Sequence, residues 1–310
     1  MESAMSSPLP AITAVIPTYQ RGAALLQTLR HLEAVQPPPA EILVVDQTET
    51  HPTDVATELV RREAAGRIRI LRFSPPSIPR AMNIGLREAK SPVVLFLDDD
   101  VVPDSRLIAA HAARHGRGPV AVCGQVLQPG EVPDPEANRV RKTRGLRADL
   151  DFRFCGTEST DLRNVMAGNL SVVRAAALAI GGFDEQFIGS AYRFETDFAR
   201  RWGAAGGRIV FAPEASVRHL RLPTGGTRSR GDHLERPSPL HACGDYYFAL
   251  RHARGVERWA YCARRLIRET CNRHHARHPG RIPLRIVSEL RALGMAIHRH
   301  REGPRWGGPP

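Results

Sequence analysis

Ser91-Pro92-Val93-Val94-Leu95-Phe96-Leu97-Asp98-Asp99-Asp100 is the stretch of sequence that decides the fold. Its unbroken apolar run, Val93 to Leu97, predicts a short strand buried on both faces, as at the centre of a parallel sheet. Aspartates follow it directly, and in open α/β sheets ligands bind at the carboxyl ends of the strands. The cluster indicates a divalent metal site facing a phosphate ligand. The alternative is a solvated loop in which Asp104 caps the next helix.

Similar apolar runs come before this strand and are separated by segments with helical spacing. The predicted strands are 11–16, 41–46 and 67–73, and the predicted helices are 23–35, 53–65 and 78–89. This alternation predicts an α/β fold with a mostly parallel, Rossmann-like sheet covered by helices. The second strand also ends in a carboxylate, so Asp46 and Asp98 are expected at the same sheet edge.

The positive charge is concentrated in the last quarter of the chain. The 310 residues carry 44 basic and 32 acidic side chains, a net charge of +12. Residues 236–310 contain 15 arginines, no lysine and 5 acids, which is +10 and leaves +2 for the first 235 residues. We therefore predict a catalytic domain over 11–235 and a separate basic region over 236–310.

Cysteine spacing and hydropathy limit the classes of protein to which this chain can belong. The five cysteines form no CxxC pair, which argues against a disulfide framework and a structural zinc site and favours a reducing compartment. Residues 1–10 do not resemble a signal peptide, and no window reaches the roughly 18 apolar residues of a membrane span. We expect a cytoplasmic protein, or one peripheral on the inner face of the cell membrane. The absence of GxGxxG and GxxxxGK[ST] lowers the expectation of a dinucleotide oxidoreductase or a P-loop NTPase.

Several short motifs, taken together, resemble a known enzyme family. They are Ala-Val-Ile-Pro-Thr-Tyr at 14–19, Ile-Leu-Val-Val-Asp at 42–46, Ala-Met-Asn-Ile-Gly at 81–85, Phe-Leu-Asp-Asp-Asp at 96–100, Ala-Gly-Asn-Leu at 167–170, Gly-Gly-Phe-Asp-Glu at 181–185 and Glu-Thr-Asp-Phe at 195–198, followed by Pro213 and His219. In this order they resemble family 2 glycosyltransferases of the GT-A fold over about residues 11–225. The resemblance implies transfer of a sugar from a nucleoside diphosphate sugar to an acceptor hydroxyl.

The resemblance also assigns candidate donor-binding residues. Those expected to contact the nucleotide sugar are Pro17, Thr18, Arg21, Asp46, Arg80, Asn83, Asp98 and Asp99. Asp46 would hold the base or ribose, unless it only caps the following helix. Arg80 and Asn83 would face the ribose or diphosphate, because an arginine fork suits phosphate oxygens; otherwise they form an ordinary polar helix face.

The metal ligands implied by the resemblance are Asp98 and Asp100, the DxD pair, together with His219. Carboxylate oxygens suit Mn²⁺ or Mg²⁺, and the ion would bridge the diphosphate. An imidazole ligand favours Mn²⁺ slightly.

The catalytic base is aligned with Glu195, and Asp197 is the second candidate. The family commonly writes paired acids here, whereas this chain has Phe194 before Glu195, so the register admits both. Acids in a first helical turn also favour the helix dipole without any catalytic role. Farther along, Arg228 is a candidate clamp on the diphosphate, in a glycine-rich loop after His219.

Two regions are open to a structural or a functional interpretation. Residues 128–160 follow no regular period and predict a solvated loop or, alternatively, a lid over the acceptor. After residue 236, apolar residues share one helical face over 256–271 and again over 286–297, with arginines opposite. These helices either pack on the catalytic domain or attach it to an anionic membrane, which suits a lipid-linked glycan acceptor. Nucleic acid is not an expected partner, since no nucleic-acid motif accompanies the charge.

The resemblance therefore implies a metal-dependent, inverting glycosyltransferase of cell-surface polysaccharide or glycolipid synthesis. A nucleotidyltransferase of related fold is one alternative, although the early loop lacks its usual glycine-rich, basic character. A non-catalytic protein that binds nucleotide sugars or membranes is the other.

Overall fold

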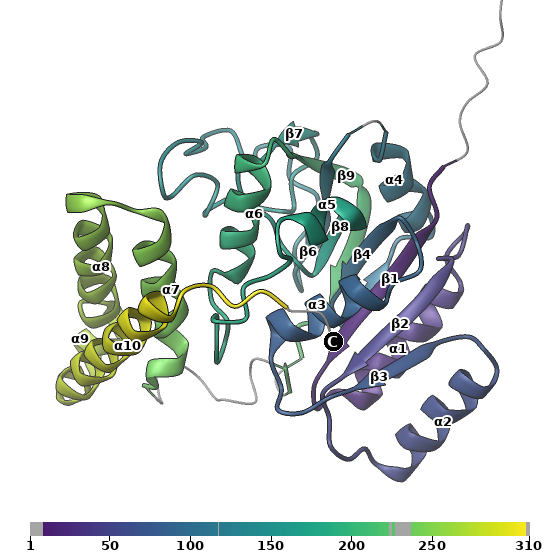
Figure 1. The fold of residues 1–310 in the computed structure, drawn as a ribbon, viewed down its shortest axis with the longest axis horizontal. Coiled ribbons are helices and arrows are strands. Elements are labelled where there is room, and N and C mark those ends of the chain that lie inside the picture. Colours follow the sequence, from purple (N-terminus) through teal and green to yellow (C-terminus); the bar gives the residue numbers. More distant parts are fainter. Residues whose placement is uncertain (1–8, 117, 223–224, 227–236, 308–310) are drawn as a thin grey trace, which may run out of the picture.

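The computed structural model describes residues 9–116, 118–222, 225–226 and 237–307. Within these ranges a central sheet carries helices on both faces (Figure 1). Its strands are β1 (Ile12–Thr18), β2 (Glu41–Asp46), β3 (Arg69–Arg72), β4 (Val93–Leu97), β5 (Val101–Pro103), β6 (Val120–Leu127), β7 (Thr160–Asp161), β8 (Asn169–Val173) and β9 (Arg208–His219). The helices of the sheet domain are α1 (Gly22–Glu33), α2 (Thr53–Ala64), α3 (Ile78–Glu88), α4 (Leu107–Arg114), α5 (Arg174–Ala179) and α6 (Phe194–Ala204). The C-terminal helices are α7 (Pro239–His252), α8 (Gly255–Thr270), α9 (Arg273–Arg277), the 3₁₀ turn η2 (Pro279–Arg281) and α10 (Ile282–Glu302).

The order of strands across the sheet is β3-β2-β1-β4-β8-β6-β9-β5, with β7 paired to β9. The first four are parallel, as the alternation of strands and helices predicts, so the carboxyl ends of β1, β2 and β4 lie at one edge. β8 runs antiparallel to β4 and pairs Asn169 with Leu97. The chain segment just before β8 therefore meets the aspartates that follow β4.

Two hydrophobic layers sandwich the sheet, because successive side chains of a strand point to opposite faces. In β4, Phe96 contributes to one buried cluster and Leu97 to the other. The cluster on the Leu97 side includes residues of α1, α2 and α4, and the cluster on the Phe96 side includes residues of α3, α5, α6 and α7. Burial on both faces explains why β4 is an unbroken apolar run.

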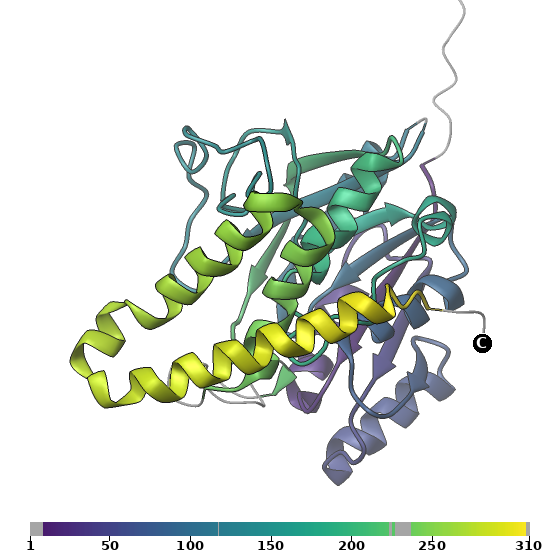
Figure 2. The ribbon, with the colours of Figure 1, turned by 60° about the vertical axis from the view of Figure 1, so that its left-hand side comes forward.

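The C-terminal helices form a lobe at one end of the molecule (Figure 1). α7 buries Tyr247 and Phe248 in the same cluster as Phe198 of α6, so this helix shares the core of the sheet domain. Figure 2 shows that α8 and α10 are joined at the end farthest from the sheet. Residue 235, the predicted boundary, lies outside the described residues, and the division into 11–235 and 236–310 stays a prediction.

α8 and α10 pack on the protein through both charged and apolar residues, the latter including Cys262, Ala292 and Ala296. Arg265 of α8 and Arg285 of α10 are buried, whereas Trp259 and Leu290 are 54% and 54% exposed. The predicted packing of these helices on the rest of the protein is present in part, because Leu293 and Ile297 of the predicted apolar face of α10 pack against the main core. No helix in the described parts of the chain is long and apolar enough to span a membrane.

Candidate active site

A cavity of about 520 Å³ lies at the carboxyl ends of β1 and β4. The loop after β1, the start of α3, the aspartates after β4, the segment before β8 and the loop before α6 all contribute to its wall. Its lining includes Pro17, Thr18, Arg21, Gln47, Ser77, Asp98, Asp99, Met166, Ala167, Gly168, Tyr192, Arg193, Glu195 and His219. Polar side chains thus lie together at the carboxyl ends of the strands, which is the edge where open α/β sheets bind ligands.

Asp98, Asp100 and His219 come together at this edge. Each offers a ligand atom, and these atoms all lie within 4.8 Å of one another. His219 Nε2 is 3.1 Å from Asp100 Oδ1 and 3.6 Å from Asp98 Oδ2. Antiparallel pairing of β5 with β9 places Val101 opposite His219, which carries the imidazole to the end of β4.

The chemistry of this group fits a divalent metal ion. The Oδ1 atom of Asp100 is buried and lies 3.2 Å from Arg21 Nη1 and 3.1 Å from His219 Nε2, but it accepts no well-aligned hydrogen bond among the described residues, which leaves a lone pair for a metal ion. His219 Nδ1 lies 3.2 Å from Gln128 Oε1, so an Nδ1–H donated to Gln128 leaves the Nε2 lone pair facing the carboxylates. Two carboxylates and one imidazole suit Mn²⁺ or Mg²⁺.

Asp99, the middle aspartate, binds protein groups. Thr18 Oγ1 donates to its Oδ2 at 2.7 Å and Arg21 Nη1 to its Oδ1 at 3.0 Å. Burial raises the pKa of Asp99 to about 6, although the charge of Arg21 opposes this shift. Asp99 therefore fixes the loop after β1 in the cavity wall.

The glycine-rich loop after β9 touches the same wall. Gly226 N–H donates to Tyr19 O at 2.8 Å, and a Cβ atom on Gly225 would lie 2.5 Å from Arg21 Cγ. Gly225 also has φ +75°, so this close approach suits glycine. Arg228, the predicted clamp, lies outside the described residues.

Glu195 lines the cavity from the first turn of α6. Its Oε1 accepts a hydrogen bond from the Ala167 N–H. Burial raises the pKa of Glu195 to about 7; the Ala167 N–H opposes the shift and the negative charge of Asp98 adds to it. A carboxyl group with this pKa can accept and release a proton near neutral pH.

Asp197 has a different environment. Its carboxylate is fully buried and accepts hydrogen bonds from Arg201 Nε at 2.8 Å, Arg251 Nε at 2.9 Å and His252 Nε2 at 2.8 Å. Burial opposes ionisation, but the His252 hydrogen bond and the charges of Arg201 and Arg251 lower the pKa of Asp197 to about 2. Asp197 does not line the cavity, and it ties α6 to α7.

Three of the predicted donor-binding residues lie outside the cavity lining. Asp46 is buried and is bound by Thr48 N–H at 2.9 Å and His51 Nε2 at 2.8 Å. The Arg80 guanidinium lies over the Phe73 ring, 5.1 Å from its centre. Asn83 binds both backbone groups of Phe183, donating to its carbonyl and accepting from its N–H, each at 2.8 Å. Asp46 does not cap the following helix, because α2 has no side-chain cap hydrogen bond, and Asn83 is buried. The donor-binding roles of the three residues stay predictions.

Several lining residues were not among the predicted ones, notably Gln47, Tyr192 and Arg193. Gln47 follows Asp46, and its Oε1 accepts from the Ser77 N–H at 2.7 Å. Arg193 lies over the Tyr192 ring at 4.4 Å and has φ +75°. A positive φ at a non-glycine residue is strained and is frequent at functional sites, but the sequence does not signal it.

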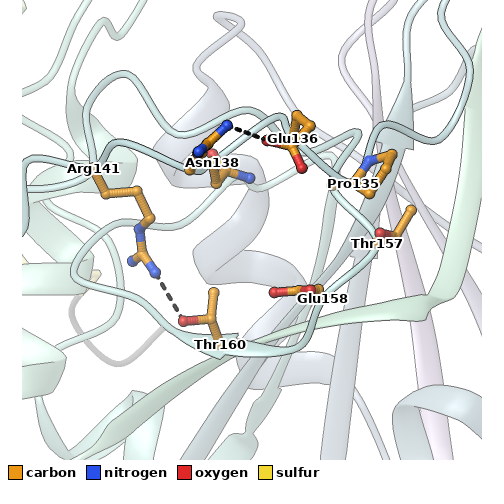
Figure 3. A pocket seen from close by; sticks show the side chains of 9 residues that line it. Pro135, Glu136, Asn138, Arg141, Thr157, Glu158 and Thr160 are labelled. Carbon is orange, nitrogen blue, oxygen red and sulfur yellow. Dashed lines mark hydrogen bonds and ion pairs between the residues drawn. The ribbon is translucent and has the colours of Figure 1, made fainter.

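Segment 128–160 is irregular, as predicted, but it is anchored to the protein. Arg141 Nη2 binds Asp149 Oδ2 at 2.8 Å, and Phe152 is buried in the main core. Leu150 and Phe154 reach the main cavity. A second, polar cavity of about 470 Å³ lies within this segment, where Arg141 donates to Thr160 (Figure 3). The predicted lid function is not tested by these contacts.

A family model described as Glycosyltransferase like family 2 matches residues 10–235. No curated protein sequence matches the chain.

Solved structures of low sequence identity share the fold. A crystal structure of GalNAc-T7 with UDP, GalNAc and Mn²⁺ aligns with a TM-score of 0.55 and 16% identity, covering 84% of this chain and 55% of that one. This chain therefore spans little more than half the length of that protein. The mannosyltransferase PcManGT from Pyrobaculum calidifontis, in complex with GDP-Man and Mn²⁺, has a TM-score of 0.52 and 15% identity, covering 94% and 76%. S. aureus TarS 1-349 with UDP-GlcNAc has a TM-score of 0.55 and 17% identity, covering 96% and 74%.

Proposed function

The chain belongs to glycosyltransferase family 2, and we propose that it transfers a sugar from a nucleoside diphosphate sugar to an acceptor hydroxyl with inversion at the anomeric carbon. The observation that carries this proposal is the shared cavity: Asp98 and His219, which with Asp100 behind them form the metal-ligand group, line one wall, and Glu195, a carboxyl group with a pKa near neutrality, lines another. A leaving-group site and a base facing one cavity are what a direct displacement requires.

The donor diphosphate is assigned to the wall formed by the ends of β1 and β4. Asp98, Asp100 and His219 would hold Mn²⁺ or Mg²⁺ there, and the bound ion would offset the charge that develops on the leaving diphosphate. Pro17, Thr18 and Arg21 would contact the nucleotide, and Gln47 takes the place beside the base or ribose that the sequence assigned to Asp46. The solved neighbours contain UDP, GDP-Man and UDP-GlcNAc, which supports a nucleotide-sugar donor without selecting one.

The acceptor approaches from the side of Glu195. Glu195 would remove the hydroxyl proton while the oxygen attacks the anomeric carbon from the face opposite the diphosphate. The new glycosidic bond then forms as the bond to the diphosphate oxygen breaks, and the proton stays on Glu195. Buried Asp197, held by Arg201, Arg251 and His252, is left with a structural role.

For the pathway, we propose synthesis of a cell-surface polysaccharide or glycolipid, with a lipid-linked glycan as the acceptor. A cytoplasmic enzyme at the inner face of the cell membrane would meet both this acceptor and a soluble donor. The charged C-terminal lobe supports such a location, because anionic lipids attract basic surfaces.

A panel of nucleotide sugars tests the proposal. With Mn²⁺, the correct donor at about 100 times its dissociation constant adds roughly 2.7 kcal/mol to the free energy of unfolding. We expect one donor to raise the melting temperature, and the protein to hydrolyse it slowly without an acceptor. Release of pyrophosphate from a nucleoside triphosphate would indicate a nucleotidyltransferase instead. Binding of a donor without any hydrolysis or transfer would indicate a non-catalytic protein.

A further inference from the structure

We propose that the outward faces of α8 and α10 dock the protein onto an anionic membrane surface, with their apolar side chains in the headgroup region. The surface, here called the lobe face, consists of Val256, Trp259, Ile267, Leu284, Val287 and Leu290. This inference names the membrane partner that the proposed function requires, but it stands on observations of the lobe alone.

The lobe face is apolar and open to solvent. Val256 is 85% exposed, Ile267 61% and Leu284 60%. Large exposed apolar groups that gather on one element mark interaction sites more often than isolated ones do. Figure 2 shows these two helices projecting beyond the sheet domain, where a flat surface could reach them.

In both helices, exposed apolar residues lie on the side that faces away from the protein. On α8, Val256 and Ile267 lie about 160–180° around the helix axis from the buried Arg265, and Trp259 lies at the edge of this outward side, since each residue adds about 100°. On α10, Val287 and Leu290 likewise lie opposite to Ser288, Ala292 and Ala296, which are buried. Packing of this chain therefore covers Leu293 and Ile297 of α10 but leaves the residues of the lobe face exposed.

A network of buried ion pairs, in addition to the apolar packing of Ala292 and Ala296, holds the lobe together. Arg265 binds Asp245 at 2.6 Å and Glu289 at 3.0 Å. Arg285 binds Glu269 at 2.6 Å and Glu289 at 2.9 Å. Because charges make these internal contacts, the apolar side chains of the lobe face are not needed for the packing of the lobe.

Three of the five acidic residues in 236–310 take part in this network of ion pairs. Asp245, Glu269 and Glu289 are turned inward, whereas Arg264, Arg268, Arg273, Arg277, Arg281 and Arg291 are exposed. The surface around the lobe face is thus strongly cationic. An anionic lipid surface is complementary to it, with each nearby arginine contributing about 1 kcal/mol, which corresponds to about five-fold in binding. A second copy of this chain would bring like charges together.

The lobe is joined to the wall of the active-site cavity. Arg193 of that wall binds Asp245 of α7 at 3.1 Å. A Cβ atom on Gly244 would lie 2.3 Å from Tyr192 O, so α7 and the cavity loop are in direct contact. Docking of the lobe face would therefore hold the acceptor side of the cavity at a fixed place relative to the membrane.

Sedimentation of the full chain with phosphatidylcholine vesicles, with and without about 30% phosphatidylglycerol, tests the proposal. We expect binding to the anionic vesicles, weakened by salt, and a blue shift of tryptophan emission that Trp259→Phe removes. Trp259 is the informative fluorophore because Trp202 is 1% exposed and Trp306 lies against Arg201. Binding to neither vesicle, or equal binding to both, would overturn the proposal.

Surface variants measure the apolar and the electrostatic contributions to vesicle binding separately. Trp259→Ser with Leu290→Ser should weaken vesicle binding by at least about tenfold, and Arg264→Gln with Arg291→Gln by about 25-fold. The matched control, Val60→Ser with Val140→Ser, changes exposed apolar residues of the sheet domain and should bind as wild type does. If instead light scattering shows a dimer that only the lobe-face variant disrupts, the face belongs to a second copy and the proposal is wrong.

Failure of this proposal and failure of the proposed function are distinguishable. The lobe-face variants should keep donor-induced stabilisation and transfer to a soluble acceptor, since none of their residues lines the active-site cavity. Vesicle binding without nucleotide-sugar binding would retain the membrane surface and reject the transferase.

Discussion

His219 Nε2 lies 3.1 Å from Asp100 Oδ1, although the two residues belong to segments far apart in the chain. Pairing of β9 with β5, the strand that directly follows the aspartates, produces this contact. The candidate metal site is thus built by a strand pairing as well as by the DxD motif. Any change that shifts β9 along β5 should impair it.

Loss of a metal ligand should abolish metal-dependent donor binding. Asp100→Ala removes a buried carboxylate oxygen, and His219→Ala removes the imidazole that faces it. We expect transfer to be lost in Asp100→Ala and Mn²⁺-dependent donor affinity to fall by about 10–100-fold in His219→Ala. Titration calorimetry with Mn²⁺ and donor measures both. Glu214→Gln, at a half-exposed glutamate on the same strand β9, is the control. Full activity of Asp100→Ala in chelator would contradict the metal role.

Removal of the base should affect turnover and not donor binding. Glu195→Gln keeps the size and shape of the side chain, so we expect kcat to fall by about 10²–10⁴-fold while donor affinity stays within a few-fold. Steady-state transfer rates and donor calorimetry give the two quantities. Glu158→Gln, at an exposed glutamate of the second cavity, should behave as wild type. Unchanged turnover in Glu195→Gln would leave the proposed mechanism without its base.

The pH profile should report the same carboxyl group. Burial raises the pKa of Glu195 to about 7, and only its deprotonated form can accept the acceptor proton. At saturating donor and acceptor, kcat should therefore rise with pH through about 7 and fall off on the acid side. This acidic limb should disappear in Glu195→Gln. A limb that persists in the variant would assign it to another group.

Asp197 should matter for stability, and its loss should not mimic loss of Glu195. Asp197→Ala leaves Arg201, Arg251 and His252 facing a buried gap, and removing one partner of a buried ion pair costs about 3–5 kcal/mol. Since the pKa of Asp197 is lowered from 3.8 to about 2, its contribution in the wild type is present above pH 3.8 and lost as pH falls towards 2. Urea unfolding of the wild type and the variant measures the difference. Glu257→Ala, an exposed acid of α8, is the control.

The C-terminal segment should stabilise the junction between α6 and α7. The Trp306 ring lies 4.5 Å from the Arg201 guanidinium and 5.4 Å from that of Arg251. Trp306→Ala should lower the free energy of unfolding by about 1–3 kcal/mol through lost packing and cation–π contacts. Trp259→Ala removes a more exposed tryptophan and should change stability by less than about 0.5 kcal/mol. Thermal unfolding of both variants decides whether the position of the ring matters.

The family and the fold class predicted from the motifs are confirmed by the family match over residues 10–235 and by the structural neighbours. The parallel half of the sheet agrees with the predicted strands to within about two residues at each end. Residue roles were harder to predict. Asp46 and Asn83 belong to motifs of the donor half, yet their side chains make hydrogen bonds within the protein and lie outside the cavity lining. A motif fixes the position of a residue in the chain, but not the partner of its side chain.

The C-terminal helices illustrate the same limit. Periodicity identified the apolar faces of both helices, and the arginines opposite to them. Which face packs inward depends on partners contributed by other helices, here Asp245 of α7 and Glu289 of α10. Apolar faces usually pack inward, so the outward direction of Trp259 and Leu290 could not be expected from the pattern alone.

The sequence by itself determined the alternation of strands and helices, the carboxylates at the end of β4 and the basic character of the last quarter of the chain. These are local properties, since hydrophobic period and charge are read from neighbouring residues. The tertiary structure decided the rest. Strand pairing brought His219 to Asp100, α7 placed Arg251 and His252 on Asp197, and burial beside Ala167 gave Glu195 a pKa near neutrality. Such roles depend on desolvation and on partners distant in the chain, which no local pattern encodes.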